Sequence, residues 1–140
     1  MATWQQFENE ADELASVIRA RFEAAETHVL ATLRKDGSPR VSGSEVEFKG
    51  ADLSFGSMLG ARKALDLRRD GRCALHAHPH GGGDAKVAGI AVEVTDPAGK
   101  GGSHAFRLDL REAVLTAVEG DELVIRLWRP GRPVETFRRK

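Results

Sequence analysis

The sequence has few of the features that mark a disulfide-stabilised, zinc-binding or strongly charged protein. It contains one cysteine, Cys73, which leaves no internal disulfide and no cysteine cluster for zinc. Its 140 residues include 21 basic and 21 acidic side chains, so the formal net charge is zero. No overall electric field would therefore attract the protein to nucleic acid or to a membrane surface.

The sequence also lacks the two kinds of segment that would send the protein out of the cytoplasm or anchor it in a membrane. The first ten residues, MATWQQFENE, include acidic residues and lack the apolar stretch of a signal peptide. No apolar run approaches the ~20 residues that a bilayer-spanning helix needs. Together with the single cysteine, these absences predict a soluble, cytoplasmic protein in reducing surroundings.

Hydrophobic residues make up 41% of the chain, enough for one core in a single domain over residues 1–140. Apolar residues recur at helical spacing after a capping box, Thr3 followed by Gln6, and predict a helix over residues 4–25. Short alternating segments follow, separated by turns such as Asp36-Gly37, and predict about seven strands. Eight extended segments are candidates for these strands: residues 28–33, 40–48, 53–57, 72–78, 86–95, 104–118, 123–128 and 134–137.

This order predicts a mainly β fold with helices: a closed or nearly closed antiparallel barrel, one N-terminal helix and one short inserted helix. Gly89, inside the segment 86–95, marks a bulge or a close backbone approach. A barrel this small fills its interior with side chains. Any sizeable ligand must therefore bind on the outside of the barrel or between subunits.

The inserted helix lies in the segment SMLGARKALDLRRD (57–70), where Arg62 and Lys63 come at its start. Cations in a first turn have the wrong sign for the helix dipole, unless an anion binds there to free backbone N–H groups. Gly60 permits a tight turn into the helix, and Ser57 adds a hydroxyl just upstream. The segment therefore predicts either a phosphate site or a surface helix in which Arg62 pairs with Asp66 four residues on.

Two segments carry a family resemblance. ATLRKDGSPRVSGSEVEF (31–48) and ADLSFGSMLGARKALDLRRDGRCALH (51–76) resemble, in this order, flavin-binding split-barrel proteins. That family includes the pyridoxamine 5′-phosphate oxidases and deazaflavin-dependent reductases. The resemblance implies a split barrel that forms a homodimer, with FMN, or alternatively an 8-hydroxy-5-deazaflavin cofactor, at the subunit interface.

The resemblance also implies which residues hold the cofactor. Arg62, Lys63 and the Ser57 hydroxyl match the group that binds the phosphate. The flavin ring is expected along residues 42–47, where small side chains leave room for a flat ring against the backbone: Ser42, Gly43 and Ser44. By itself, VSGS is more typical of a weak strand with a bulge, and only its order relative to Arg62 and Lys63 favours the flavin site.

The sequence departs from the pyridoxamine phosphate oxidases proper at their functional positions. Those enzymes have an arginine where Ser42 stands and a lysine where Glu47 stands. Their C-terminal RxLHDR-like run is also absent, since this chain ends in RLWRPGRPVETFRRK. The departures argue against vitamin B6 as the substrate.

Histidines and one tryptophan offer further candidates. His76, His78 and His80 alternate along a strand, and His104 could join them in holding a metal ion, but no cysteine or paired carboxylate completes a known spacing. Lining the mouth of the cofactor pocket is the preferred interpretation, and no metal site is predicted. Trp128 is a candidate to pack against the flavin ring.

The functional prediction is an FMN-binding oxidoreductase that transfers a hydride or two electrons to a small organic acceptor. A deazaflavin-dependent reductase is one alternative, and a non-enzymatic flavin- or haem-binding protein is another. In a flavoprotein the cofactor performs the chemistry, so no catalytic acid or base is assigned.

Overall fold

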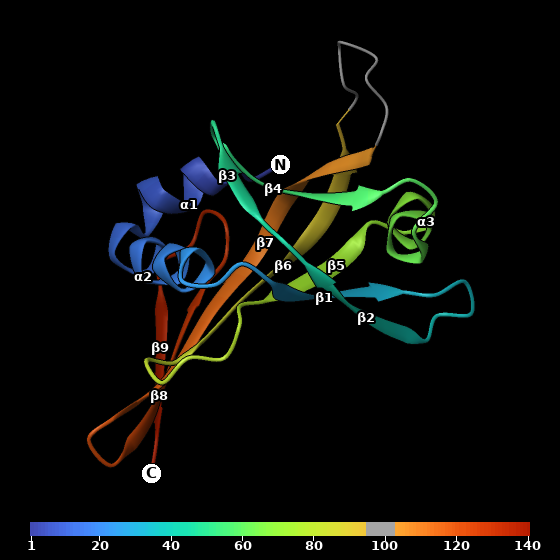
Figure 1. The fold of residues 1–140 in the computed structure, drawn as a ribbon. Coiled ribbons are helices and arrows are strands. Elements are labelled where there is room, and N and C mark those ends of the chain that lie inside the picture. Colours follow the sequence, from blue (N-terminus) through green and yellow to red (C-terminus); the bar gives the residue numbers. More distant parts are fainter. Residues whose placement is uncertain (95–102) are drawn as a thin grey trace.

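A single antiparallel sheet curls into a split barrel, with helices packed at two sides of it (Figure 1). The computed structural model describes residues 1–94 and 103–140. The helices are Trp4–Glu10 (α1), Asp12–Glu23 (α2) and Arg62–Arg69 (α3). The strands are His28–Leu33 (β1), Pro39–Ser44 (β2), Glu47–Lys49 (β3), Asp52–Met58 (β4), Arg72–His76 (β5), Asp84–Glu93 (β6), Ser103–Glu119 (β7), Glu122–Trp128 (β8) and Glu135–Arg139 (β9).

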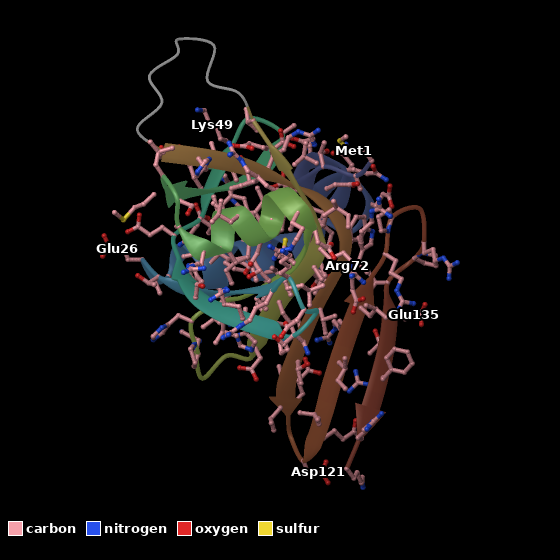
Figure 2. The ribbon with its side chains drawn as sticks, turned by 90° about the vertical axis from the view of Figure 1, so that its right-hand side faces the viewer. Met1, Glu26, Lys49, Arg72, Asp121 and Glu135 are labelled. Carbon is pink, nitrogen blue, oxygen red and sulfur yellow. The ribbon has the colours of Figure 1, made fainter. Side chains whose placement is uncertain are left out.

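The strand order explains both the barrel and its opening. Along the sheet the order is β2-β1-β5-β6-β7-β4-β3, so β2 and β3 stand at the two ends of the path. The long strand β7 changes partners: its first residues pair with β4 and its last residues pair with β8. The strands β7, β8 and β9 thus form an arm whose tip, at Asp121, lies far from α3 (Figure 2).

The core lies between the sheet and the two N-terminal helices. Its largest fully buried side chains include Phe7, Phe22, Phe106 and Trp128. Phe7 stacks on Trp128 with ring centroids 4.6 Å apart. The apolar residues expected along the N-terminal helical segment therefore pack against the sheet and cover this side of the barrel. In the described residues, no helix is long and apolar enough to cross a bilayer.

The predicted N-terminal helix is divided in two. Thr3 caps α1 as expected, since its hydroxyl accepts a hydrogen bond from the Gln6 N–H at 3.1 Å. The chain then breaks at Ala11, whose φ of −145° and ψ of 59° are not helical. The break lets the stripes of both short helices face a curved sheet. Asp12 and Glu13, in the first turn of α2, are the sequence signal for this second N-terminus.

The segment expected to be one strand over residues 40–48 is also divided. Its first part, β2, pairs with β1, and its last part, β3, pairs with β4 at the other end of the sheet. Residues 45–46 between them cross the barrel opening. Because of this division, the eight candidate segments form nine strands in the described residues, where about seven strands were expected.

Gly89 lies at the bulge that the sequence predicts. The β6–β7 register shifts between Ala88 and Gly89, and a Cβ atom on Gly89 would collide with the carbonyl oxygen of Asp109. We expect Gly89→Ala to destabilise the fold by about 1–3 kcal/mol, because strand backbone must move to make room.

Urea unfolding of Gly89→Ala measures this effect. The matched control is Gly81→Ala, because a Cβ there meets nothing within 4 Å. The control should change stability by less than about 0.5 kcal/mol. Equal stability of the two variants would show that the close approach at Gly89 is unimportant.

His28 has a structural role at the start of β1. Its ring is buried, its Nε2–H donates to the Phe22 carbonyl at 2.8 Å, and its Nδ1 accepts from the His78 N–H at 2.9 Å. Burial lowers the pKa of His28, which keeps this ring neutral. His28 thereby ties the end of α2 and the segment after β5 to the same strand.

Candidate functional site

The helix α3 begins without the caps that most helices have. Gly60 has a φ of +72°, and the turn is closed by a hydrogen bond from the Ala61 N–H to the Met58 carbonyl at 3.1 Å. Ala61 occupies the N-cap position with no side-chain cap, and the first turn contains no acidic residue. Backbone N–H groups at the start of α3 are therefore available to an external acceptor. Arg62 and Lys63 add two positive side chains at the same end.

The alternative pairing of Arg62 with Asp66 is wrong. The Asp66 carboxylate is 4% exposed and points toward the sheet, where it accepts hydrogen bonds from Thr32 Oγ1 at 2.8 Å and Arg40 Nε at 2.8 Å. Arg69 Nη2 supplies a third, at 2.9 Å. Burial alone would raise the pKa of Asp66, but these three donors outweigh it and lower that pKa.

Asp66 fixes α3 to β1 and β2 and leaves the cations at the helix start unneutralised. Within residues 1–94 and 103–140, no ion pair involves Arg62 or Lys63. The charge that the sequence places at this helix end is therefore still available for a ligand.

Four of the expected site residues meet in one groove of about 500 Å³ at the barrel opening: Gly43, Ser44, Ser57 and Lys63. The groove lies between β2 and β4, with α3 at one end. Lys63 Nζ donates to the Gly43 carbonyl at 2.9 Å and so bridges α3 to the edge strand. Ser57 is 8% exposed, and its hydroxyl makes a long, 3.3 Å hydrogen bond to the Met58 carbonyl. This hydroxyl can turn to another acceptor at small cost.

The other three expected residues have different positions. Arg62 is exposed at the start of α3, next to Lys63. Ser42 is half-buried and pairs with the core residue Leu30, on the inner side of β2. Trp128 is 0% exposed and stacks on Phe7, so the structure does not bring it to the groove.

A second hollow of about 290 Å³ continues the groove, with Glu45, Gly56 and Ser103 in both. His104 lines this extension and is 6% exposed. From the sequence, His104 was a possible metal ligand or, in the preferred interpretation, one of several histidines at the mouth of the cofactor pocket. The signal for its inward orientation was the alternation with the buried Phe106 and Leu108 along the same strand.

Other candidate features of the described residues lie apart from the groove. No three His, Cys, Asp or Glu side chains in the described ranges could hold a metal ion together. Cys73 is buried, and burial raises its pKa to about 12, so its thiol is unreactive. A larger hollow of about 700 Å³ lies between α2 and the β7–β9 arm. It contains none of the expected site residues, and its one arginine, Arg126, is paired with Glu119 at 3.1 Å.

The curled antiparallel sheet, open between β2 and β4 beside a basic helix start, is a split β-barrel of the kind that the sequence resemblance implies. The family model for pyridoxamine 5′-phosphate oxidase matches residues 14–119. The chain belongs to this family.

Solved structures show the same fold at low identity. An FMN-binding, pyridoxamine 5′-phosphate oxidase-related protein from Nostoc punctiforme is 10% identical, with a TM-score of 0.67 over 89% of this chain and 94% of that chain. A haem-binding protein from Mycobacterium smegmatis is 13% identical, with a TM-score of 0.62 over 89% and 57%, respectively. An F420 reductase is 18% identical, with a TM-score of 0.50 over 60% and 85%. No curated protein matches the sequence.

Proposed function

We propose that the groove binds FMN and that its phosphate lies at the start of α3. The observation that carries this proposal is the meeting of an uncapped helix start, two unneutralised cations and the Ser57 hydroxyl beside one groove. Lys63 uses one of its three donors on Gly43, which leaves two for a phosphate. Anions bind at helix N-termini because backbone N–H groups and the helix dipole both favour negative charge.

The rest of the groove fits a flat ring system. Gly43 and Ser44 contribute little side-chain bulk along β2, and Gly56 does the same along β4. The groove volume is within the ~300–1,000 Å³ that is usual for cofactor sites. In this proposal the backbone of β2, at residues 42–44, faces the polar edge of the ring.

We further propose an oxidoreductase activity toward a small organic acceptor. A bound flavin would supply two-electron redox chemistry, and the protein's residues would hold it, orient it and limit its contact with water. Ser42 and Glu47 replace the two cations of the vitamin B6 enzymes, so a different substrate is expected. The buried Cys73 agrees with a reducing compartment such as the cytoplasm, which is the location we propose.

Deazaflavin is the second candidate cofactor, because a phosphate-bearing tricyclic ligand of this kind would use the same helix start. The fold similarity to an F420 reductase is the observation that favours it. Haem is the third candidate cofactor, because the fold is similar to that of a haem-binding protein.

We also propose that the groove is completed by a second copy of the chain. The outer face of β1 and β2 beside Gly43 exposes Val29 and Val41, at 42% and 70%, and Leu59 and Leu65 near α3 are 58% and 44% exposed. Apolar surface of this kind next to a ligand groove is typical of an interface. Sedimentation of the flavin-loaded protein should give twice the chain mass of 15.2 kDa; a monomer would contradict the dimer.

The visible spectrum of the purified protein, followed by titration with each cofactor, tests the proposal. We expect a flavin band near ~450 nm, whereas deazaflavin would absorb near ~420 nm and haem near ~400 nm. Steady consumption of NAD(P)H with a dye acceptor would support an enzyme. Tight flavin binding without turnover would instead support storage, and no binding of any of the three cofactors would contradict the proposed function.

A further inference from the structure

The turn that leads into α3 has little to hold it in place. Leu59 is 58% exposed and Gly60 has no side chain, so they contribute little apolar packing within the chain. Ala61 bonds only to the neighbouring Met58 and to the first turns of α3. In the described part of the chain, one hydrogen bond joins residues 59–61 to an element that is distant in sequence: the Gly60 N–H donates to His104 Nε2 at 3.4 Å. The position of this turn therefore depends on a histidine of β7.

His104 is itself held in one orientation. Its Nδ1 donates to Glu93 Oε2 at 3.1 Å, and Glu93 accepts two hydrogen bonds from Arg68, at 2.8 and 2.9 Å. The Arg68 guanidinium lowers the pKa of Glu93 to about 2, so this carboxylate is charged. A charged acceptor at Nδ1 places the proton there and leaves Nε2 free to accept from Gly60.

The chain of contacts returns to the helix from which it started. Arg68 is in the last turn of α3, whereas Gly60 comes just before its first turn. His104 and Glu93, on β7 and β6, thus tie both ends of α3 to the same side of the barrel. His104 is also the cross-strand neighbour of Ser57, the buried hydroxyl of the groove.

We infer that His104 is a positioning residue for the anion site: through Gly60 it fixes where the α3 start presents its N–H groups and cations. This inference rests on the proposed function. The expected consequence is an effect on phosphate binding alone, because His104 contacts the helix start through Gly60 and lines the extension, not the groove beside β2 where the ring is proposed to bind.

The first test uses ligand-free protein. Nitrogen-15 NMR of the imidazole should show a protonated Nδ1 and an unprotonated Nε2 on His104. In His104→Ala the Gly60 amide should exchange with solvent at least about threefold faster, because one acceptor is lost. His104→Gln retains an acceptor near the Nε2 position and should preserve the slow exchange of the Gly60 amide. His104→Asn retains only a group that can face Glu93, so its Gly60 amide should exchange as fast as in His104→Ala.

The second test compares FMN with riboflavin, which lacks the phosphate. His104→Ala and His104→Asn should weaken FMN binding by about fivefold, as expected for one lost hydrogen bond, and leave riboflavin binding unchanged. His104→Gln should bind both like the parent protein. The matched control is His76→Ala, which removes a half-buried imidazole on β5, outside the groove lining.

Two results would overturn the inference: an unchanged Gly60 amide in His104→Ala, or an equal loss of FMN and riboflavin affinity. If the parent protein binds no flavin, the proposed function fails, and the NMR experiment still decides whether His104 holds the turn.

Discussion

Replacing Arg62 and Lys63 together by alanine is expected to weaken FMN binding by about 2–5 kcal/mol, which is about 30-fold or more in the dissociation constant. Both side chains stand at a helix start that contains no acidic residue, and no ion pair in the described ranges neutralises them. A phosphate would be their charged partner. Isothermal titration of FMN into parent and variant measures the effect.

The control must remove the same charge elsewhere. Arg129→Ala with Arg132→Ala does so, because both residues are exposed in the turn after β8 and neither lines the groove. This control should bind FMN like the parent protein. Equal weakening of both double variants would mean that only net charge matters, and unchanged binding in the first would remove the assigned role of Arg62 and Lys63.

Asp66→Ala is expected to lower the free energy of unfolding by about 3–5 kcal/mol, the usual effect of removing one partner from a buried ion pair. The Asp66 side chain is 4% exposed, and its loss leaves Arg40, which is 24% exposed, without its carboxylate. The Thr32 hydroxyl loses its acceptor at the same time. Urea unfolding followed by circular dichroism gives the change in stability.

Thr32→Val keeps this test informative if Asp66→Ala fails to fold. It removes one of the three donors to Asp66 and should cost about 1 kcal/mol. Asp121→Ala is the control, since its 3.7 Å contact with Lys140 is exposed and should contribute little. If Asp66→Ala were as stable as Asp121→Ala, α3 would not depend on its buried carboxylate.

The local features of the fold could be predicted from the sequence because they depend on neighbouring residues. The Asp36-Gly37 turn, the strand that precedes it and the helix that begins at Arg62 were all expected and are present. The break at Ala11 was not, because the apolar stripe of residues 4–22 has the spacing of one continuous helix. The acidic pair Asp12-Glu13 was the local sign of a second helix start.

The candidate site was predictable in part for a similar reason. Arg62, Lys63 and Ser57 lie within seven positions of each other, so their association is nearly local. Two of the three partners of Asp66 are 26 and 34 positions away, and the partners of His104 are 11 and 44 positions away. Such contacts follow from strand order, which a single sequence does not reveal. Trp128 was misplaced for the same reason. Its residue type suggested a contact with the flavin ring, whereas its burial beneath α1 follows from the fold.

The affinities of the unaltered protein for FMN and for riboflavin are the most direct measurement, because these ligands share a ring system and differ by the phosphate. If the start of α3 is an anion site, FMN should bind tighter by about 30-fold or more at low salt, and added salt should reduce the difference. Equal affinities for the two ligands would contradict the central claim, since they would show that the cations at this helix start hold no phosphate.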